Sequence, residues 1–214
     1  MNAIIFANGE LKLPPEWAKL LASSDLLIAV DGGAKHVRAL GLTADLLIGD
    51  LDSILADDFA SMQSANVETL AFPSDKNQSD LELALLAANK RGADKIFVLA
   101  GLGRRWDHSF VNVLIPAQEA FLGFSVEFLD GLQRLFIIHD AIRLNEKTGS
   151  RLSLIPIGGD AQGVKTEGLQ YTLDHEELRM GSSRGLSNIF SRNKVNISLE
   201  KGMLLCILSP GDLN

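Results

Sequence analysis

Two aspartates at alternate positions are the first residues whose types and spacing suggest chemistry. Asp50 and Asp52 follow the apolar run 46–48, with Gly49 between. In an extended chain, residues two apart point to the same side, and two neighbouring carboxylates repel each other unless a cation lies between them. Such oxygen ligands suit Mg²⁺, which takes one or two carboxylates and completes its shell with water and phosphate. The alternative is a solvated turn after a strand, because Gly, Asp and Ser all favour turns.

Three further segments carry polar groups that suit phosphate or substrate binding. The loop 72–80 leads into a helix, where Asp80 is either a ligand or a first-turn acid that complements the helix dipole, with Ser79 as N-cap. Segment 101–108 combines two glycines with two arginines, and arginine binds phosphate through a planar fork of donors. A tight loop with solvated charges is the alternative there. The hydroxyl- and amide-rich loop 181–188 is of a kind that often forms only a turn.

The elements that position these groups are short apolar strands alternating with helices. We expect strands over residues 3–7, 26–30, 46–48, 67–71, 95–100 and 125–129, and helices over about 15–21, 34–40, from 79, and 109–121. Strands that are apolar on both faces and alternate with helices indicate a parallel sheet covered by helices. Ligands of such sheets bind at the carboxyl ends of the strands, so Asp31, Asp50, Asp52 and Asp80 should gather at one edge.

The pattern changes near Asp130. Short strand candidates at 135–138, 151–155, 169–173, 194–199 and 203–208 are separated by turns, several with glycine, and little helical periodicity remains. Such spacing is typical of a β-sandwich. The sequence therefore predicts an N-terminal parallel α/β (Rossmann-like) domain, residues 1–130, followed by a C-terminal antiparallel β-sandwich, residues 131–214.

Composition narrows the class of protein. The 214 residues are 46% hydrophobic and carry a net charge of −7, which argues against a nucleic-acid partner because such binders carry a basic surface. Cys206 has no partner for an internal disulfide, which fits a reducing compartment. The apolar run 3–7 is too short for a signal peptide, and no run reaches a membrane span. We expect a cytoplasmic protein that acts on small molecules, with no membrane partner.

Taken together and in this order, the segments resemble the thiamine pyrophosphokinase family. The motifs that carry the resemblance are Asp31-Gly32-Gly33, residues 49–54, Ser79-Asp80, residues 103–108 with Asn112, residues 168–171 and residues 183–188. They span nearly the whole chain, and six motifs in register make coincidence a poor explanation. The family fold agrees with the α/β and β-sandwich arrangement expected above.

The resemblance implies Mg²⁺-dependent transfer of pyrophosphate from ATP to the hydroxyl group of thiamine. Asp50, Asp52 and Asp80 are then the metal ligands, and with Arg105 they are the catalytic residues. The residues implied to contact ATP are Asp31, Gly32, Gly33, Lys76, Ser79, Arg105, Asp107 and His108. The residues implied to bind thiamine are Tyr171, by stacking, with Ser187 and Asn188. The α/β domain would hold ATP and Mg²⁺, and the β domain would contribute to thiamine binding and to a homodimer with active sites at the subunit interface.

The chain departs from the family pattern at some of these motifs. Asn77 replaces a carboxylate that is common at that position, and Arg104 stands where glycine is common, which makes Arg105 the safer phosphate contact. His108 either contacts the nucleotide or supports its loop. Two other functions remain open: pyrophosphoryl transfer to another acceptor, such as a hydroxymethyl pterin, and a non-catalytic sensor of nucleotide or thiamine. Tyr171 with the loop 181–188 argues against the first, and the three aspartates argue against the second.

Overall fold

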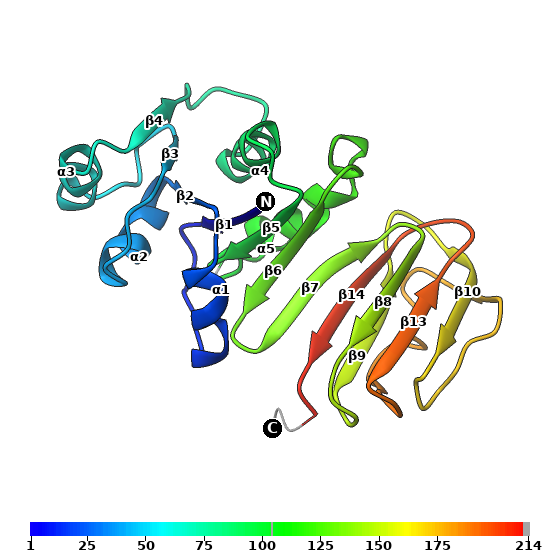
Figure 1. Ribbon diagram of the computed structural model, residues 1–214. Helices are drawn as coiled ribbons and strands as arrows, with labels where there is room; N and C mark the ends of the chain where they lie inside the picture. The colour runs from blue at the N-terminus through cyan, green and yellow to red at the C-terminus, as the bar shows by residue number, and fades with distance from the viewer. Residues whose placement is uncertain (104, 212–214) are drawn as a thin grey trace. The chain divides into compact units, whose positions relative to one another are not determined.

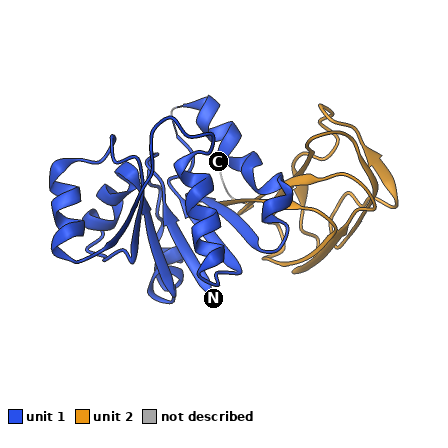
Figure 2. Ribbon diagram, turned by 90° about the horizontal axis from the view of Figure 1, so that it is seen from above, with its two compact units in different colours: residues 1–131 blue, residues 132–214 orange. Residues whose placement is uncertain are grey.

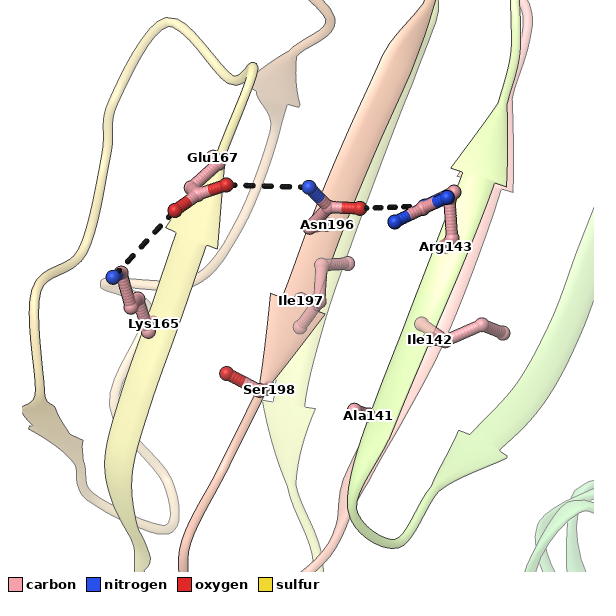
Figure 3. Close-up of a pocket in the computed structure, with 8 residues that line it drawn as sticks. All are labelled: Ala141, Ile142, Arg143, Lys165, Glu167, Asn196, Ile197 and Ser198. Atoms are coloured by element: carbon pink, nitrogen blue, oxygen red, sulfur yellow. Dashed lines mark hydrogen bonds and ion pairs between the residues drawn. The ribbon is translucent and has the colours of Figure 1, made fainter.

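The computed structural model describes residues 1–103 and 105–211 and divides into two compact units (Figure 2). Unit 1 comprises residues 1–131 and unit 2 comprises residues 132–214. None of the helices in the two described stretches is long and apolar enough to cross a membrane.

Unit 1 contains a parallel sheet in the order β6-β5-β1-β2-β3-β4 (Figure 1). Its strands are β1 (Asn2–Phe6), β2 (Leu26–Val30), β3 (Leu46–Gly49), β4 (Glu68–Ala71), β5 (Lys95–Leu99) and β6 (Ser125–Asp130). All residues of β2 and β3 are buried, as their unbroken apolar sequences predict for central strands covered on both faces. The predicted α/β class is confirmed.

The strand order contains one reversal, and it lies beside β1. From β1 the chain proceeds outward through β2, β3 and β4, and then returns to add β5 on the other side of β1. The loops that follow β1 and β5 therefore leave the sheet in opposite directions. In open α/β sheets this reversal opens a crevice at the carboxyl ends of the strands, where ligands bind.

The connections of unit 1 are helical. They are η1 (Pro15–Trp17), α1 (Ala18–Ala22), η2 (Asp31–Gly33), α2 (Ala34–Ala39), α3 (Ala56–Ser64), α4 (Asp80–Lys90), α5 (Trp106–Leu114), η3 (Ile115–Ala117) and η4 (Glu119–Phe121). Helix α4 begins where Ser79 Oγ accepts a hydrogen bond from Glu82 N–H, at 3.2 Å. It buries Leu81, Ala84, Leu85 and Ala88, which recur at the spacing of one helix face. Ser79 is thus an N-cap, as its position before the helix predicted.

Unit 2 is built from two antiparallel sheets that share one core. In one layer of unit 2 the strand order is β12-β9-β14-β7, and in the other it is β11-β10-β13-β8. The strands are β7 (Gln133–Ile138), β8 (Ala141–Asn145), β9 (Arg151–Pro156), β10 (Ala161–Glu167), β11 (Glu176–Leu178), β12 (Asn188–Ile189), β13 (Lys194–Ser198) and β14 (Leu204–Ser209). In β13, Val195 and Ile197 are buried and the residues that alternate with them are not, so the strand has one core face. The expected β-sandwich is confirmed.

Local structure differs from the sequence-based expectation in several places. The helix expected over 109–121 is α5, which begins at Trp106 and gives way after Leu114 to two 3-10 turns, the first containing Pro116. Proline lacks an N–H and cannot continue the helical ladder. Residues 169–173 form no regular strand; only Leu169 bridges to Phe190. Helix α3 and strands β8, β10, β11 and β12 were not predicted, because their sequences are more polar than those of the other elements.

Candidate active site

Three strand ends of unit 1 carry unusual backbone conformations. Asp31 after β2, Leu51 after β3 and Ala100 after β5 have φ angles of 45°, 66° and 53°. Such left-handed conformations are uncommon for residues other than glycine and cost free energy, so they persist only where surrounding structure enforces them. All three lie at the carboxyl edge of the sheet, which is where a ligand site is expected.

At this edge the carboxylates of Asp31, Asp50 and Asp80 converge. One oxygen from each lies within 4.8 Å of the others. Asp31 Oδ1 accepts a hydrogen bond from Leu51 N–H at 3.0 Å, which joins the loops after β2 and β3. Gly49 makes this approach possible, because a Cβ at that position would lie 1.7 Å from Asp31 Oδ1. The topology therefore gathers three acids that are far apart in sequence.

Burial and mutual repulsion make the cluster electrostatically costly. Asp31 is only 7% exposed, and burial raises the pKa of its carboxyl to about 7. The Leu51 N–H opposes this rise, while the charges of Asp80 and Asp50 add to it. A bound cation would stabilise this cluster, because it would compensate the carboxylates for their lost hydration and offset their mutual repulsion.

Lys76 provides part of the positive charge. Its Nζ lies 2.7 Å from Asp80 Oδ1. Burial lowers the pKa of Lys76, but Asp80, Asp50 and Asp31 outweigh it, so the net pKa is raised and the ammonium stays charged. The contact is an ion pair at hydrogen-bond distance. Three carboxylates against one ammonium leave negative charge and an oxygen donor set, which fit Mg²⁺.

Asp52 lies beside the cluster. Its backbone N–H donates to Asp50 Oδ1 at 3.1 Å, and its side chain is exposed. A hydrogen bond with the Asp50 carboxyl and that group's charge raise the pKa of Asp52. The predicted metal set was Asp50, Asp52 and Asp80. The structure places Asp31, predicted as a nucleotide contact, within 4.8 Å of Asp50 and Asp80 as well, and the metal role of Asp52 stays a prediction. In the sequence, Asp31 stands directly after a buried strand and before Gly32 and Gly33, and this position indicates that it lies at the carboxyl edge of the sheet.

The residues predicted to contact ATP are otherwise distributed along the same edge. Gly32 and Gly33 are buried in the short turn η2, and Ser79 caps α4. Arg105 and Asp107 pair with each other, with Nη2 to Oδ2 at 2.6 Å, and both are exposed. The hydrogen bond from Arg105 lowers the pKa of Asp107 to about 2.

The remainder of this loop is open to solvent. His108 Nε2 lies 4.0 Å from Asp107 Oδ2. Trp106 is 84% exposed at the start of α5, and Phe110 on the same helix is also exposed, so neither side chain supports the core. Arg104 lies outside the described residues. A phosphate that binds Arg105 would compete with Asp107 for its donors.

In unit 2 two of the predicted thiamine residues, Tyr171 and Asn188, are joined by hydrogen bonds. Tyr171 N–H donates to Asn188 Oδ1 at 3.0 Å, and Asn188 Nδ2 donates to the Tyr171 carbonyl at 2.6 Å. Asn188 Oδ1 also accepts from Ile189 N–H at 2.9 Å. Asn188 is nearly buried, whereas Tyr171 is 62% exposed. The amide of Asn188 thus fixes the backbone that presents the Tyr171 ring.

Ser187 adopts an unusual conformation beside this group. Its φ is 56°, and its N–H donates to Ser153 Oγ at 3.1 Å. Since the left-handed region is disfavoured for serine, the loop is held in place by its hydrogen bonds. Sequence reasoning placed Tyr171, Ser187 and Asn188 together but could not tell that Asn188 acts on the Tyr171 backbone.

The fold and the carboxylate cluster suit an enzyme that binds a phosphate-bearing ligand at the carboxyl ends of a parallel sheet. Comparison with known families gives the same result. The model described as "Thiamin pyrophosphokinase, catalytic domain" matches residues 17–122, and the model described as "Thiamin pyrophosphokinase, vitamin B1 binding domain" matches residues 139–204. The chain belongs to the thiamine pyrophosphokinase family.

Individual relatives agree along the whole chain. The thiamine pyrophosphokinase of Bacillus subtilis (strain 168) is 25% identical over 207 residues, which cover 96% of this chain and 97% of that protein. Thiamine pyrophosphokinase 1 of Arabidopsis thaliana is 25% identical over 231 residues, covering 96% of this chain and 85% of that protein. The crystal structure of the Bacillus subtilis protein superposes with a TM-score of 0.85 at 23% identity, covering 98% of this chain and 99% of that one. It shares the fold.

Proposed function

We propose that this enzyme transfers a pyrophosphoryl group from ATP to thiamine and requires Mg²⁺. The hydroxyl oxygen of thiamine forms a bond to the β-phosphorus of ATP. The bond from that phosphorus to the oxygen bridging it to the α-phosphorus breaks, so AMP leaves with the bridging oxygen. The hydroxyl proton goes to solvent or to a nearby carboxylate. The observation that carries this proposal is the convergence of Asp31, Asp50 and Asp80 beside Lys76 in a member of this family.

The residues of unit 1 supply charge and position. Asp50 and Asp80, with Asp31 or Asp52, would hold Mg²⁺, which would supply positive charge to the phosphate oxygens of the nucleotide. Lys76 carries a positive charge at the same place. Arg105, 68% exposed at its side chain, can exchange Asp107 for a phosphate, because a bidentate guanidinium binds either anion.

The residues of unit 2 suit the organic substrate. Thiamine carries an aromatic pyrimidine and a positive thiazolium ring, and the exposed face of Tyr171 can stack on such a group. We propose that Ser187 lies near the same ring and that Asn188 orients Tyr171. A homodimer whose active sites lie at the subunit interface, and a cytoplasmic location, belong to the same proposal.

The test is phosphorus NMR of the protein incubated with ATP, thiamine and Mg²⁺, beside samples lacking thiamine or Mg²⁺. AMP and thiamine pyrophosphate should appear together, and only in the complete mixture. ADP with thiamine monophosphate would refute pyrophosphoryl transfer. Turnover with a hydroxymethyl pterin but not with thiamine would reassign the acceptor. Thiamine binding without turnover would favour a sensor.

A further inference from the structure

A second polar network lies at the same edge of the unit 1 sheet and is centred on Asn8, directly after β1. The Asn8 side chain donates from Nδ2 to Ser53 Oγ at 3.2 Å, and its Oδ1 accepts from Lys35 Nζ at 2.7 Å. Ser53 Oγ also accepts from Gly32 N–H at 3.2 Å. One carboxamide thus connects the loops that follow β1, β2 and β3.

Asn8 packs closely against its neighbours. A Cβ on Gly32 would lie 2.4 Å from Asn8 Oδ1, so the side chain of Asn8 fits there only because residue 32 is glycine. On its other side, Gly9 N–H donates to the carbonyl of Ala100 after β5, at 2.8 Å. The loop after β1 is therefore held between those after β2 and β5. This is the point where the strand order reverses and a ligand crevice opens.

Lys35 brings a positive charge to this point. Its Nζ donates to the carbonyl oxygen and to Oδ1 of Asn8, at 3.1 and 2.7 Å. Both acceptors are neutral, and the ion pairs found among residues 1–103 and 105–211 do not include Lys35. An ammonium has three donors, so one remains for a ligand. The side chain is partly exposed, as a ligand contact requires.

Lys35 is separate from the carboxylate cluster. Lys76 Nζ lies 2.7 Å from Asp80 Oδ1, whereas both hydrogen bonds described for Lys35 go to Asn8. Lys76 is thus paired with an acid, and Lys35 with a neutral side chain. An accessible cation that is oriented by a neutral group at the crevice of an α/β sheet suits an anionic group of a bound nucleotide.

We propose that Lys35, oriented by Asn8, binds the phosphate chain of the nucleotide. Asn8 is the positioning residue and Lys35 the contact. This inference rests on the proposed function for the identity of the nucleotide, but it assigns a site outside the carboxylate cluster and the Arg105 loop. It predicts that both residues determine affinity for phosphate groups rather than for the nucleoside.

The test measures binding without turnover. The probe is α,β-methylene-ATP with Mg²⁺, whose bridging carbon prevents pyrophosphoryl transfer, and calorimetry with the full chain gives its Kd. Lys35→Ala should weaken binding about tenfold or more, as expected for loss of a charge-assisted hydrogen bond. Lys35→Arg should recover most of the affinity. Adenosine, titrated at millimolar concentration, should bind Lys35→Ala and the wild type equally, because it carries no phosphate.

Asn8→Ala tests the positioning role. It should weaken α,β-methylene-ATP binding in the same direction, and the double variant should be no weaker than Lys35→Ala alone, because Asn8 acts through Lys35. Lys90→Ala, at the exposed end of α4, is the matched control and should bind as the wild type does.

The outcomes separate this inference from the proposed function. Unchanged affinity of Lys35→Ala for α,β-methylene-ATP, or an equal loss of adenosine binding, overturns the role of Lys35. Additive effects of the two substitutions overturn the role of Asn8. A wild type that binds the probe but forms no thiamine pyrophosphate refutes the proposed function and leaves the binding result decisive for Lys35. A wild type that does not bind the probe overturns both.

Discussion

Asp31→Asn should make the metal-free protein more stable at alkaline pH while it lowers activity. Asp31 is buried against Asp50 and Asp80, and its φ of 45° is tolerated well by asparagine. The new side chain keeps an oxygen to accept the hydrogen bond from Leu51 N–H. The substitution therefore removes the charge with little change in shape.

The magnitude follows from the pKa of Asp31, which rises from the ordinary value of 3.8 to about 7. Because the folded state binds this proton more tightly, stability is highest at acid pH and falls as pH rises through the window from 3.8 to about 7. At about 1.4 kcal/mol per pKa unit, the loss is at most about 4 kcal/mol. Local relaxation and water entry reduce it, so we expect about 2 kcal/mol.

Urea denaturation in EDTA at about pH 5 and about pH 8 measures this difference. At the higher pH the variant should exceed the wild type by about 2 kcal/mol in free energy of unfolding, and at the lower pH the gap should shrink. Saturating Mg²⁺ should stabilise the wild type more than the variant, because the ion binds the native carboxylate cluster. AMP release should fall in the variant.

The matched control is Asp57→Asn, an exposed carboxylate on α3 that should change stability little at either pH. The reasoning is refuted if Asp31→Asn is no more stable than the wild type at about pH 8 without metal. A gain of the same size at both pH values would also count against it, because the effect would then not depend on ionisation.

Other substitutions test separate parts of the site. Asp52→Asn should leave stability within about 0.5 kcal/mol, since the side chain is exposed, while AMP release falls at least about 100-fold; wild-type turnover would exclude a role in metal binding. Asn188→Ala should cost about 2 kcal/mol in thermal unfolding and raise KM for thiamine but not for ATP, because two hydrogen bonds that orient Tyr171 and one from Ile189 N–H are lost. Gly49→Ala should abolish activity and destabilise the fold by about 3 kcal/mol, because its Cβ would overlap the Asp31 carboxylate; retained Mg²⁺ affinity would contradict this.

The fold class was predictable because the strands of unit 1 are unbroken apolar runs. β2 and β3 can be buried only in the middle of a sheet, and this places the residues that follow them at one edge. Helix α3 was not predictable in the same way, because its sequence has few apolar positions and only Asp58 and Met62 are buried. Asp58 is held there by Arg38, at 2.5 Å, a long-range pair that no local pattern reveals.

The composition of the carboxylate cluster shows a similar limit. The spacing of Asp50 and Asp52 indicates two side chains on one side of an extended chain, but Leu51 has a left-handed φ of 66°, so the chain is not extended there. Asp52 is exposed beside the cluster, whereas Asp31, from the neighbouring loop after β2, lies within it. The order of strands and acids in the sequence predicts that the acids lie at this edge of the sheet. Which acids contact one another depends on the backbone conformation, such as the left-handed φ of Leu51.

The carboxyl edge of the unit 1 sheet concentrates features that cost stability. Three residues other than glycine adopt left-handed conformations there, each costing on the order of 1–3 kcal/mol. The buried Asp31 adds an ionisation penalty, and the charges of Asp50 and Asp80 increase it. Selection for stability alone would not favour these features, because substitutions that relieve strain or buried charge commonly raise stability. Their concentration at one edge is what the two proposals above require, in which the acids bind a cation and Lys35 binds the anion that accompanies it.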